Sequence, residues 1–320
     1  MDFYYAKPRD AKKLVEFVNA VLPCRCGSAQ ELVTHDVHNN TYDYKHTYSL
    51  EIVPVCKDSV VCLPKKLAQS LGNMGQICVC LRVSNVIHLI DPCTGQMAEV
   101  SGTAFWRSPF ESVSRVRAMT EYTVIEMEPL QASLSLGHAQ ISRKHALADV
   151  WCMRSAELGQ ANAKQIHTRT HLGHLLNVGD TALGFELATS NLNCSELEKL
   201  DPSLVPDVVL VKKVYDRQRR LRRRKWKLRH MTEEAMAVMT EGASSTGNDY
   251  NDFLEDLEED PRLREGVNVY RDAGKLPPVE SEETSEGGDD DIPQISLQEM
   301  MDDLVLESDQ AEAPAEENVL

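Results

Sequence analysis

Histidine, cysteine and acidic side chains are the groups in this chain that could bind a metal or transfer a proton. The segment THDVH places His35, Asp36 and His38 close together. Nothing nearby completes a matched set of ligands, so we interpret this segment as an ordinary loop. The pair Cys24 and Cys26 is too closely spaced for a usual zinc knuckle, and two ordinary thiols are expected there.

A second group lies in IHTRTHLGHLL, where His167, His171 and His174 stand at i, i+4 and i+7. A helix would place them on one face, but no carboxylate or cysteine accompanies them at that spacing. Together with Arg169 they favour a phosphate-contacting surface over a metal site. P-loop, G-x-G-x-x-G and G-x-S-x-G motifs are absent from the sequence. We therefore predict no enzyme, no metal and no cofactor.

The most concentrated charge is a basic run from Lys212 to Arg229, which holds 11 of the chain's 34 basic residues and one acidic residue, Asp216. Such a run either grips phosphate or is an address that a transport receptor binds. Its basic residues are Lys212, Lys213, Arg217, Arg219, Arg220, Arg222, Arg223, Arg224, Lys225, Lys227 and Arg229.

Charge is divided unevenly along the 320 residues, whose formal net charge is −16. Residues 230–320 contain 27 acidic and 4 basic residues, a net charge of −23, which leaves +7 for residues 1–229. This pattern is typical of a body that faces nucleic acid and a separate interaction tail. No stretch approaches the roughly 18 apolar residues of a membrane span, so a soluble intracellular protein without a membrane partner is expected.

The nine cysteines are odd in number and form no C-x-x-C pair. Cys78 and Cys80, in the apolar run QICVCLRV, would share one face of a strand. Buried, reduced thiols in a cytosolic or nuclear protein are therefore favoured over a disulfide framework.

Apolar periodicity predicts the elements. Residues 9–22 have helical spacing and end at Pro23, and a short helix over 64–73 ends at Gly72 and Asn73. Otherwise short β-branched runs alternate with turns, of which DPCTGQ (91–96) is the clearest. Many short strands and few long helices indicate an α+β, mainly β fold with two tandem small barrels, at 61–112 and 113–214.

After Asp216 the pattern becomes helical, and we expect a basic helix over 215–241. Residues 242–320 are acidic, rich in Ser, Gly and Pro, and almost free of aromatic residues. Such sequence buries too little apolar surface to offset its chain entropy, so a disordered acidic tail is predicted. One segment, 295–309, differs from the rest of the tail because it has regularly placed large apolar residues.

Several runs resemble one family: NNTYDYKHTYSLEIVPVCKDSVVCLP, SLGNMGQICVCLRVSNVIHLIDP and RTHLGHLLNVGDTALGFEL. They are similar to the eukaryotic adapters that export large ribosomal subunits from the nucleus, the Nmd-three family. With the basic helix and the acidic tail, the resemblance covers essentially the whole chain. It implies an SH3-like barrel and then an OB-like domain, as in the hypusine-bearing translation factor. It also implies binding at the tRNA sites of the immature large subunit (rRNA and ribosomal proteins) and export with an exportin and Ran GTP.

The chain departs from the family at its start. The family begins with a cysteine-rich, zinc-binding module of C-x-x-C pairs that contacts the subunit, and residues 1–60 look like only the end of that N-terminal region. We therefore expect no zinc here, and a truncated isoform or fragment. The resemblance further implies shuttling between the nucleus, both nucleoplasm and nucleolus, and the cytoplasm.

Within this frame the basic run is predicted to be chiefly a nuclear import signal that an import receptor binds, with rRNA contact as a second role. It leaves the folded body and precedes a disordered tail, and like charges at helical spacing disfavour a plain solvated helix. The OB-type barrel suggests RNA contact by basic and histidine side chains. The candidates are Lys65, Lys66, Arg107, His167, Arg169, His171 and His174.

The segment ISLQEMMDDLVLESD (295–309) is predicted to be a leucine-rich nuclear export signal. Its anchors, at spacings of three, four and two, are Leu297, Met300, Leu304 and Leu306. The first three would lie on one stripe of a short helix that an apolar groove can accept. Two functions remain open: an export adapter that bridges the subunit to an exportin, or an RNA-binding assembly factor that does not bind exportin directly.

Overall fold

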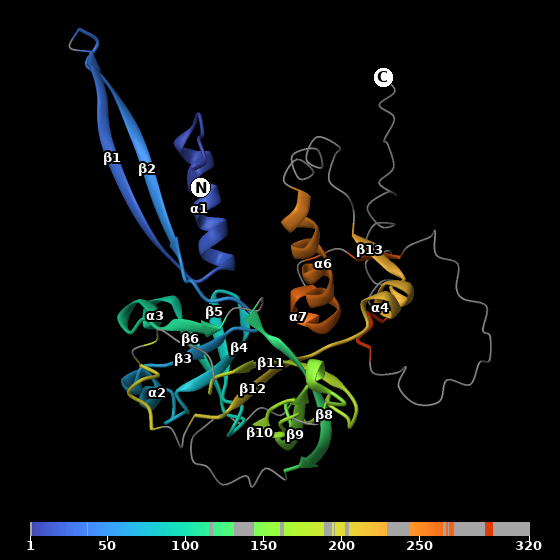
Figure 1. The fold of residues 1–320 in the computed structure, drawn as a ribbon. Helices are drawn as coiled ribbons and strands as arrows, with labels where there is room; N and C mark the ends of the chain where they lie inside the picture. Colours follow the sequence, from blue (N-terminus) through green and yellow to red (C-terminus); the bar gives the residue numbers. More distant parts are fainter. Residues whose placement is uncertain are drawn as a thin grey trace, which may run out of the picture. The chain divides into compact units, whose positions relative to one another are not determined.

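The computed structural model describes residues 2–36, 38–114, 118–130, 144–160, 163–188, 194, 196–201, 205–228, 243–264, 267, 269–271 and 292–296. The chain divides into two compact units, residues 1–214 and 215–320 (Figure 1). Within the described ranges, none of the helices combines the length and apolar character that crossing a membrane requires.

The first unit begins with the predicted helix and a long hairpin. Helix α1 spans Pro8–Val21, with proline in the first turn, where its missing N–H breaks no hydrogen bond. Strands β1 (Cys24–Asp36) and β2 (Thr41–Ile52) pair antiparallel, and the turn between them includes Asn40 in the left-handed region at φ 48°. This hairpin was not predicted from the sequence.

Five antiparallel strands form the sheet of the first barrel, in the order β6-β5-β4-β3-β7. The predicted short helix is present as α2, and the left-handed φ angles of Gly72 (90°) and Asn73 (57°) follow its end. The turn at 91–96 connects β5 to β6, as predicted. The bounds are β3 Val60–Cys62, α2 Lys65–Ser70, β4 Ile77–Val83, β5 Val86–Ile90, β6 Met97–Ser101, α3 Gly102–Arg107 and β7 Glu111–Ser114.

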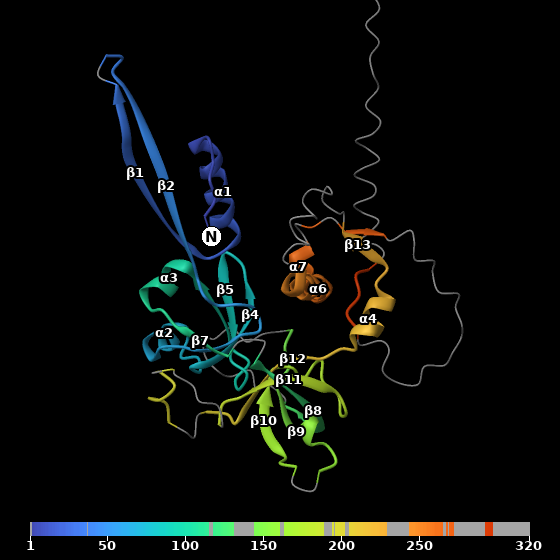
Figure 2. The ribbon, with the colours of Figure 1, turned by 45° about the horizontal axis from the view of Figure 1, so that its top comes forward.

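The second barrel also has a five-stranded antiparallel sheet, in the order β10-β9-β8-β11-β12, which can be followed in Figure 2. The two edge strands of this sheet, β10 and β12, lie close together. The Thr168 hydroxyl on β10 donates a hydrogen bond to the carbonyl of Val208 on β12. The bounds are β8 Thr120–Pro129, β9 Ala148–Arg154, the 3-10 turn η2 Ser155–Glu157, β10 Ile166–Thr170, β11 Thr181–Glu186 and β12 Val208–Lys213.

The two barrels share an apolar core, which explains why their strands are apolar on both faces. Along β4, Cys78 and Cys80 point into the first barrel, as the strand alternation predicted. Val79 points the other way and packs in one cluster with Phe185 and Val209 of the second barrel. Burial on both faces gives near-continuous apolar runs, so alternation of polar and apolar residues is weak in these strands.

The second unit contains α4 (Arg217–Arg223), β13 (Trp226–Leu228), α6 (Ala243–Glu259), α7 (Pro261–Arg264) and β14 (Val269–Arg271). The predicted basic helix is therefore shorter than 215–241, since it ends at Arg223 and a strand follows. The segment 243–271 departs from the expected disorder of the tail, because it forms helices and pairs β14 with β13. Leu254 and Leu257, three residues apart, supply a buried helical stripe.

Candidate functional site: the basic run and its acidic partner helix

The basic run is divided between the two units. Lys212 and Lys213 end strand β12 of the first unit, and the arginines begin the second. Lys213 is buried, and its Nζ lies 3.0 Å from the Leu175 carbonyl oxygen and 2.7 Å from Asp180 Oδ2. The structure therefore corrects the prediction for Lys213: this side chain stabilises the second barrel and is not accessible to a receptor.

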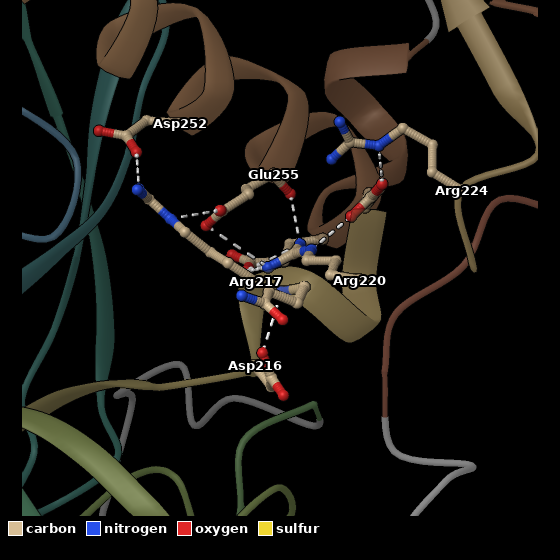
Figure 3. Close-up of polar contacts among 9 residues, drawn as sticks. Asp216, Arg217, Arg220, Arg224, Asp252 and Glu255 are labelled. Atoms are coloured by element: carbon tan, nitrogen blue, oxygen red, sulfur yellow. Dashed lines mark hydrogen bonds and ion pairs between the residues drawn. The ribbon is translucent and has the colours of Figure 1, made fainter. Parts of the chain in front are cut away.

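An N-cap fixes the start of α4. The Asp216 carboxylate accepts a hydrogen bond from the backbone N–H of Gln218 at 2.9 Å. Arg217, Arg220 and Arg224 follow at spacings of three and four, so they project from one side of this short helix and its C-terminal end. Figure 3 shows these three guanidinium groups directed at α6. We call them the arginine face.

Arg220 is the centre of the arginine face and is bonded to several groups of α6. It donates to the Glu258 carboxylate, and its Nη1 lies 3.2 Å from Glu259 Oε1 and 3.6 Å from Glu255 Oε2. Its Nη2 also donates to the Glu255 backbone carbonyl at 2.9 Å. One guanidinium thus contacts three carboxylates and a carbonyl, which satisfies most of its fork of donors.

The outer arginines extend the contact in both directions. Arg217 Nη2 lies 3.0 Å from Asp252 Oδ1, and Arg224 Nε lies 2.6 Å from Glu258 Oε1. Arg217 and Asp252 are more than half exposed, whereas Arg224 is 9% exposed. The contact between the arginine face and α6 is therefore exposed to solvent at Arg217 and largely shielded from it at Arg224.

Burial sets the energetics of the central pair. The side chains of Arg220 and Glu258 are each 3% exposed. Burial lowers the pKa of Arg220, but the hydrogen bond that it donates to Glu258 and the charges of Glu259, Glu258 and Glu255 outweigh burial, so the pKa is raised overall. Removing either partner leaves the other buried with fewer compensating contacts, which is costly in a site that excludes water.

A small apolar core holds the helices together. It consists of Trp226, Leu254, Leu257, Val269 and Ile295. The Arg224 guanidinium lies 5.1 Å from the Trp226 ring centroid, within cation–π range, and so connects the arginine face to this core.

The other predicted import residues lie mainly on the surface. Arg222, Lys225 and Lys227 are exposed, and Arg223 and Lys212 are partly buried. The side chain of Arg219 and all of Arg229 lie outside the described residues. The predicted export anchors Leu297, Met300, Leu304 and Leu306 also lie outside them.

Most predicted RNA-contacting residues of the body are exposed but do not form one cluster in the described structure. Lys65 and Lys66 begin α2, and Arg107 ends α3. His167 and Arg169 alternate with buried residues on β10. Arg169 donates to both carboxylate oxygens of Asp149, at 2.8 and 3.3 Å, while the His167 ring lies 4.8 Å from that of Trp151.

His171 was predicted wrongly as a surface residue. It is 1% exposed, and neither ring nitrogen has a hydrogen-bond partner within the described ranges. Burial, reinforced by His145 and His174, lowers the pKa of His171 to about 3. The histidines do not lie on one face of a helix, because His167 is on strand β10 and His171 follows that strand. His174 is exposed as a residue, but partial desolvation of its imidazole, with the charge of Lys144, lowers its pKa.

The remaining candidate ligands do not converge. His35 stacks on Tyr42, with ring centroids 4.3 Å apart, and Cys24 donates its thiol to the Asn19 side chain. Among the residues that the structure describes, no three His, Cys, Asp or Glu side chains are arranged to hold a metal ion.

Three models of one protein family match the chain. "NMD3, second domain" covers residues 1–52, "NMD3 SH3 domain" covers 55–103, and "NMD3 OB-fold domain" covers 119–213. A Danio rerio protein named 60S ribosomal export protein NMD3 is 50% identical over 307 residues, which are 96% of this chain. The chain belongs to the NMD3 family. The predicted order of an SH3-like barrel and then an OB-like domain is therefore confirmed.

Two other relatives of the same name agree with this assignment. The Homo sapiens protein is 49% identical over 310 residues, and the Saccharomyces cerevisiae protein is 37% identical over 314 residues, which are 97% and 95% of this chain. The chain spans 59% of the length of each of these three relatives.

Two features of this chain were not predicted from its sequence. One is the acidic partner of the basic run: in NDFLEDLEED, Asp252, Glu255 and Glu259 repeat the spacing of three and four found in the arginine face. The other is an aromatic stripe on β2, visible as the alternation in TYDYKHTY; Tyr42 and Tyr44 are exposed, and their ring centroids lie 6.3 Å apart.

Proposed function

We propose that this chain acts in an adapter for the nuclear export of the large ribosomal subunit. The observation that carries the proposal is its 37–50% identity, over 95–97% of its length, to relatives named 60S ribosomal export protein NMD3. Sedimentation of the tagged chain with purified pre-60S subunits tests it. We expect co-sedimentation, and chain that stays at the top of the gradient at every subunit concentration would contradict the subunit contact.

The bridge to the exportin is assigned to residues 295–309. Apolar anchors followed by acidic residues suit an apolar groove with a basic rim. Each buried anchor contributes roughly 1.5–3 kcal/mol before ordering costs, so the loss of two should abolish so short a contact. Leu304→Ala with Leu306→Ala should therefore trap the protein in the nucleus and remove binding to exportin with Ran GTP.

A matched control replaces two apolar residues of the same segment that are not predicted anchors, Met301→Ala with Val305→Ala. The control should distribute like the parent. If the anchor variant also distributes like the parent and retains exportin binding, the chain functions as an RNA-binding assembly factor without direct exportin contact, which is the second candidate.

Import is assigned to the accessible part of the basic run. Arg222, Lys225 and Lys227 are exposed and lie next to the arginine face, so a receptor that binds basic residues can reach them. Replacing all three with Ala should leave the protein in the cytoplasm even when export is blocked. The control is Lys12→Ala with Lys13→Ala on α1, also exposed, which should still enter the nucleus. Undiminished entry of the triple variant would contradict the assignment.

A further inference from the structure

The acidic helix α6 covers the arginine face of α4, and its carboxylates engage all three arginines of that face. Arginine binds carboxylate and phosphate through the same bidentate fork of N–H donors. Asp252, Glu255, Glu258 and Glu259 of α6 therefore occupy positions that phosphate oxygens of a nucleic-acid backbone can take. The arginine face is chemically suited to RNA and is already occupied by a part of the same chain.

We propose that the arginine face is an RNA phosphate-binding surface, and that α6 is an internal competitor that covers it until RNA displaces the helix. This inference rests on the proposed contact of the chain with RNA and is independent of exportin binding. In this proposal the role of the acidic segment 243–259 is not receptor binding. The segment prevents non-selective binding of polyanions to the arginine face.

The burial of the contact indicates how complete the cover is. Arg220 and Glu258 are each 3% exposed, and Arg224 is 9% exposed. A phosphate cannot reach these guanidinium groups while α6 is in place. Only Arg217, which is 58% exposed, remains partly accessible. RNA can therefore use the full arginine face only after α6 has moved away.

The attachment of α6 is of a kind that a polyanion can compete with. Apart from the ion pairs, it depends on a small apolar core in which α6 contributes the side chains of Leu254 and Leu257. Segments with few buried apolar contacts open at a low free-energy cost. Because α6 is tethered to α4 in the same chain, its effective concentration is high, and only a multivalent ligand exchanges for several carboxylates at once.

A test compares binding of a single-stranded oligouridylate to the full chain and to a variant with Asp252→Asn, Glu255→Gln, Glu258→Gln and Glu259→Gln, which removes the carboxylates that contact all three arginines. Freeing three arginines adds up to three phosphate contacts, which steepens the slope of log K against log salt by about 2 for a single strand. Between 200 and 50 mM salt, the affinity of the variant should therefore rise roughly 15-fold more than that of the parent.

Two matched variants show where the gain comes from. Adding Arg217→Gln, Arg220→Gln and Arg224→Gln to the acidic variant should return the affinity and the slope to those of the parent. A control with Asp2→Asn, Glu16→Gln, Glu31→Gln and Asp43→Asn removes equal formal charge from exposed positions of the first unit and should change little. If removing charge there gives an equal gain, general electrostatics accounts for the effect and the proposal is overturned.

Other outcomes also decide the question. The proposal is overturned if the gain in RNA affinity persists after the three arginines have been replaced. It is also overturned if neither the parent nor the acidic variant binds RNA. A gain in binding to an import receptor without a gain for RNA assigns the covered face to protein transport and overturns it as well. Unfolding of the second unit in the acidic variant does not obscure the result, because exposed arginines should still bind more tightly and more salt-dependently.

Discussion

Loss of the Arg220 guanidinium tests the energetics of the buried pair most directly. In Arg220→Gln the Glu258 carboxylate keeps its contact with Arg224 but loses its central partner, while remaining out of water. Breaking a buried ion pair by removing one member costs about 3–5 kcal/mol. Arg217→Gln removes an ion pair with Asp252 whose members are both more than half exposed, together with a longer contact of 3.4 Å with Glu255, and exposed pairs contribute about 0–1 kcal/mol.

This difference is large relative to the core that supports it. Among the described residues, the apolar cluster of the second unit has five buried members, which include Trp226, Leu254 and Leu257. A loss of about 3 kcal/mol should raise the open population of α6 more than 100-fold, since each 1.4 kcal/mol is a factor of ten. Hydrogen exchange of backbone amides in 250–259, followed by mass spectrometry, measures that population. Exchange in β8 and β12 of the first unit is the internal control and should not change.

A rescue variant separates charge from packing. Arg220→Met with Glu258→Leu removes both buried charges and keeps a comparable apolar volume, an exchange that is often neutral or stabilising in other proteins. We expect the double variant to exchange more slowly than Arg220→Gln alone. If Arg217→Gln and Arg220→Gln accelerate exchange equally, or if the double variant is the worst of the three, the reasoning from burial is refuted.

Two further predictions concern the first unit. The pKa of His171 is about 6.5 in the unfolded chain and about 3 in the folded protein, so the free energy of unfolding should fall as the pH drops between these values, by about 2 kcal/mol at pH 5. In thermal unfolding, His171→Leu should show a smaller loss than the parent, with the remainder due to His145, whose pKa is lowered to about 4, and exposed His167→Leu should keep the full loss. Asp91, 2% exposed, accepts from the backbone N–H of Gly75 and Cys93 and from the Thr94 hydroxyl, at 3.1, 2.9 and 2.7 Å. Asp91→Ala leaves these three donors without an acceptor and should lower the free energy of unfolding in urea by about 3–5 kcal/mol, whereas Asp91→Asn should have a smaller effect. Equal stability of the Ala variant and the parent would show that the donors find other partners.

The strands of the two barrels were predictable because their apolar residues are local and periodic. The runs SVVCLP (59–64) and QICVCLRV (76–83) contain β3 and β4. Strand β10 was not predicted, because IHTRT contributes only Ile166 as a large apolar residue and its buried threonines look polar in sequence. The β1–β2 hairpin was missed for a related reason: it is almost entirely exposed, so hydrophobic burial does not select its register.

The candidate site was predicted only in part. A dense run of arginines is visible in any sequence, but its partner depends on a contact more than 30 residues away. Arg220 and Glu258 are 38 positions apart, and nothing local in either segment identifies the other. Charge repulsion within the run argued against a bland helix, and the structure gives the physical resolution: α6 supplies the opposite charge that α4 lacks, so the helix forms.

The same small core links the two proposed transport signals. Ile295 is buried beside Trp226 and Leu257, two residues before the first predicted export anchor, Leu297. Trp226 lies within the basic run, between Lys225 and Lys227, which are assigned to import. We therefore expect a substitution that opens this core to change the local structure next to both proposed signals. Variants of the core, such as Leu257→Ala, should alter exportin and import-receptor binding together, whereas variants of one signal should alter only one. Independent responses of the two receptors to Leu257→Ala would show that the core does not couple them.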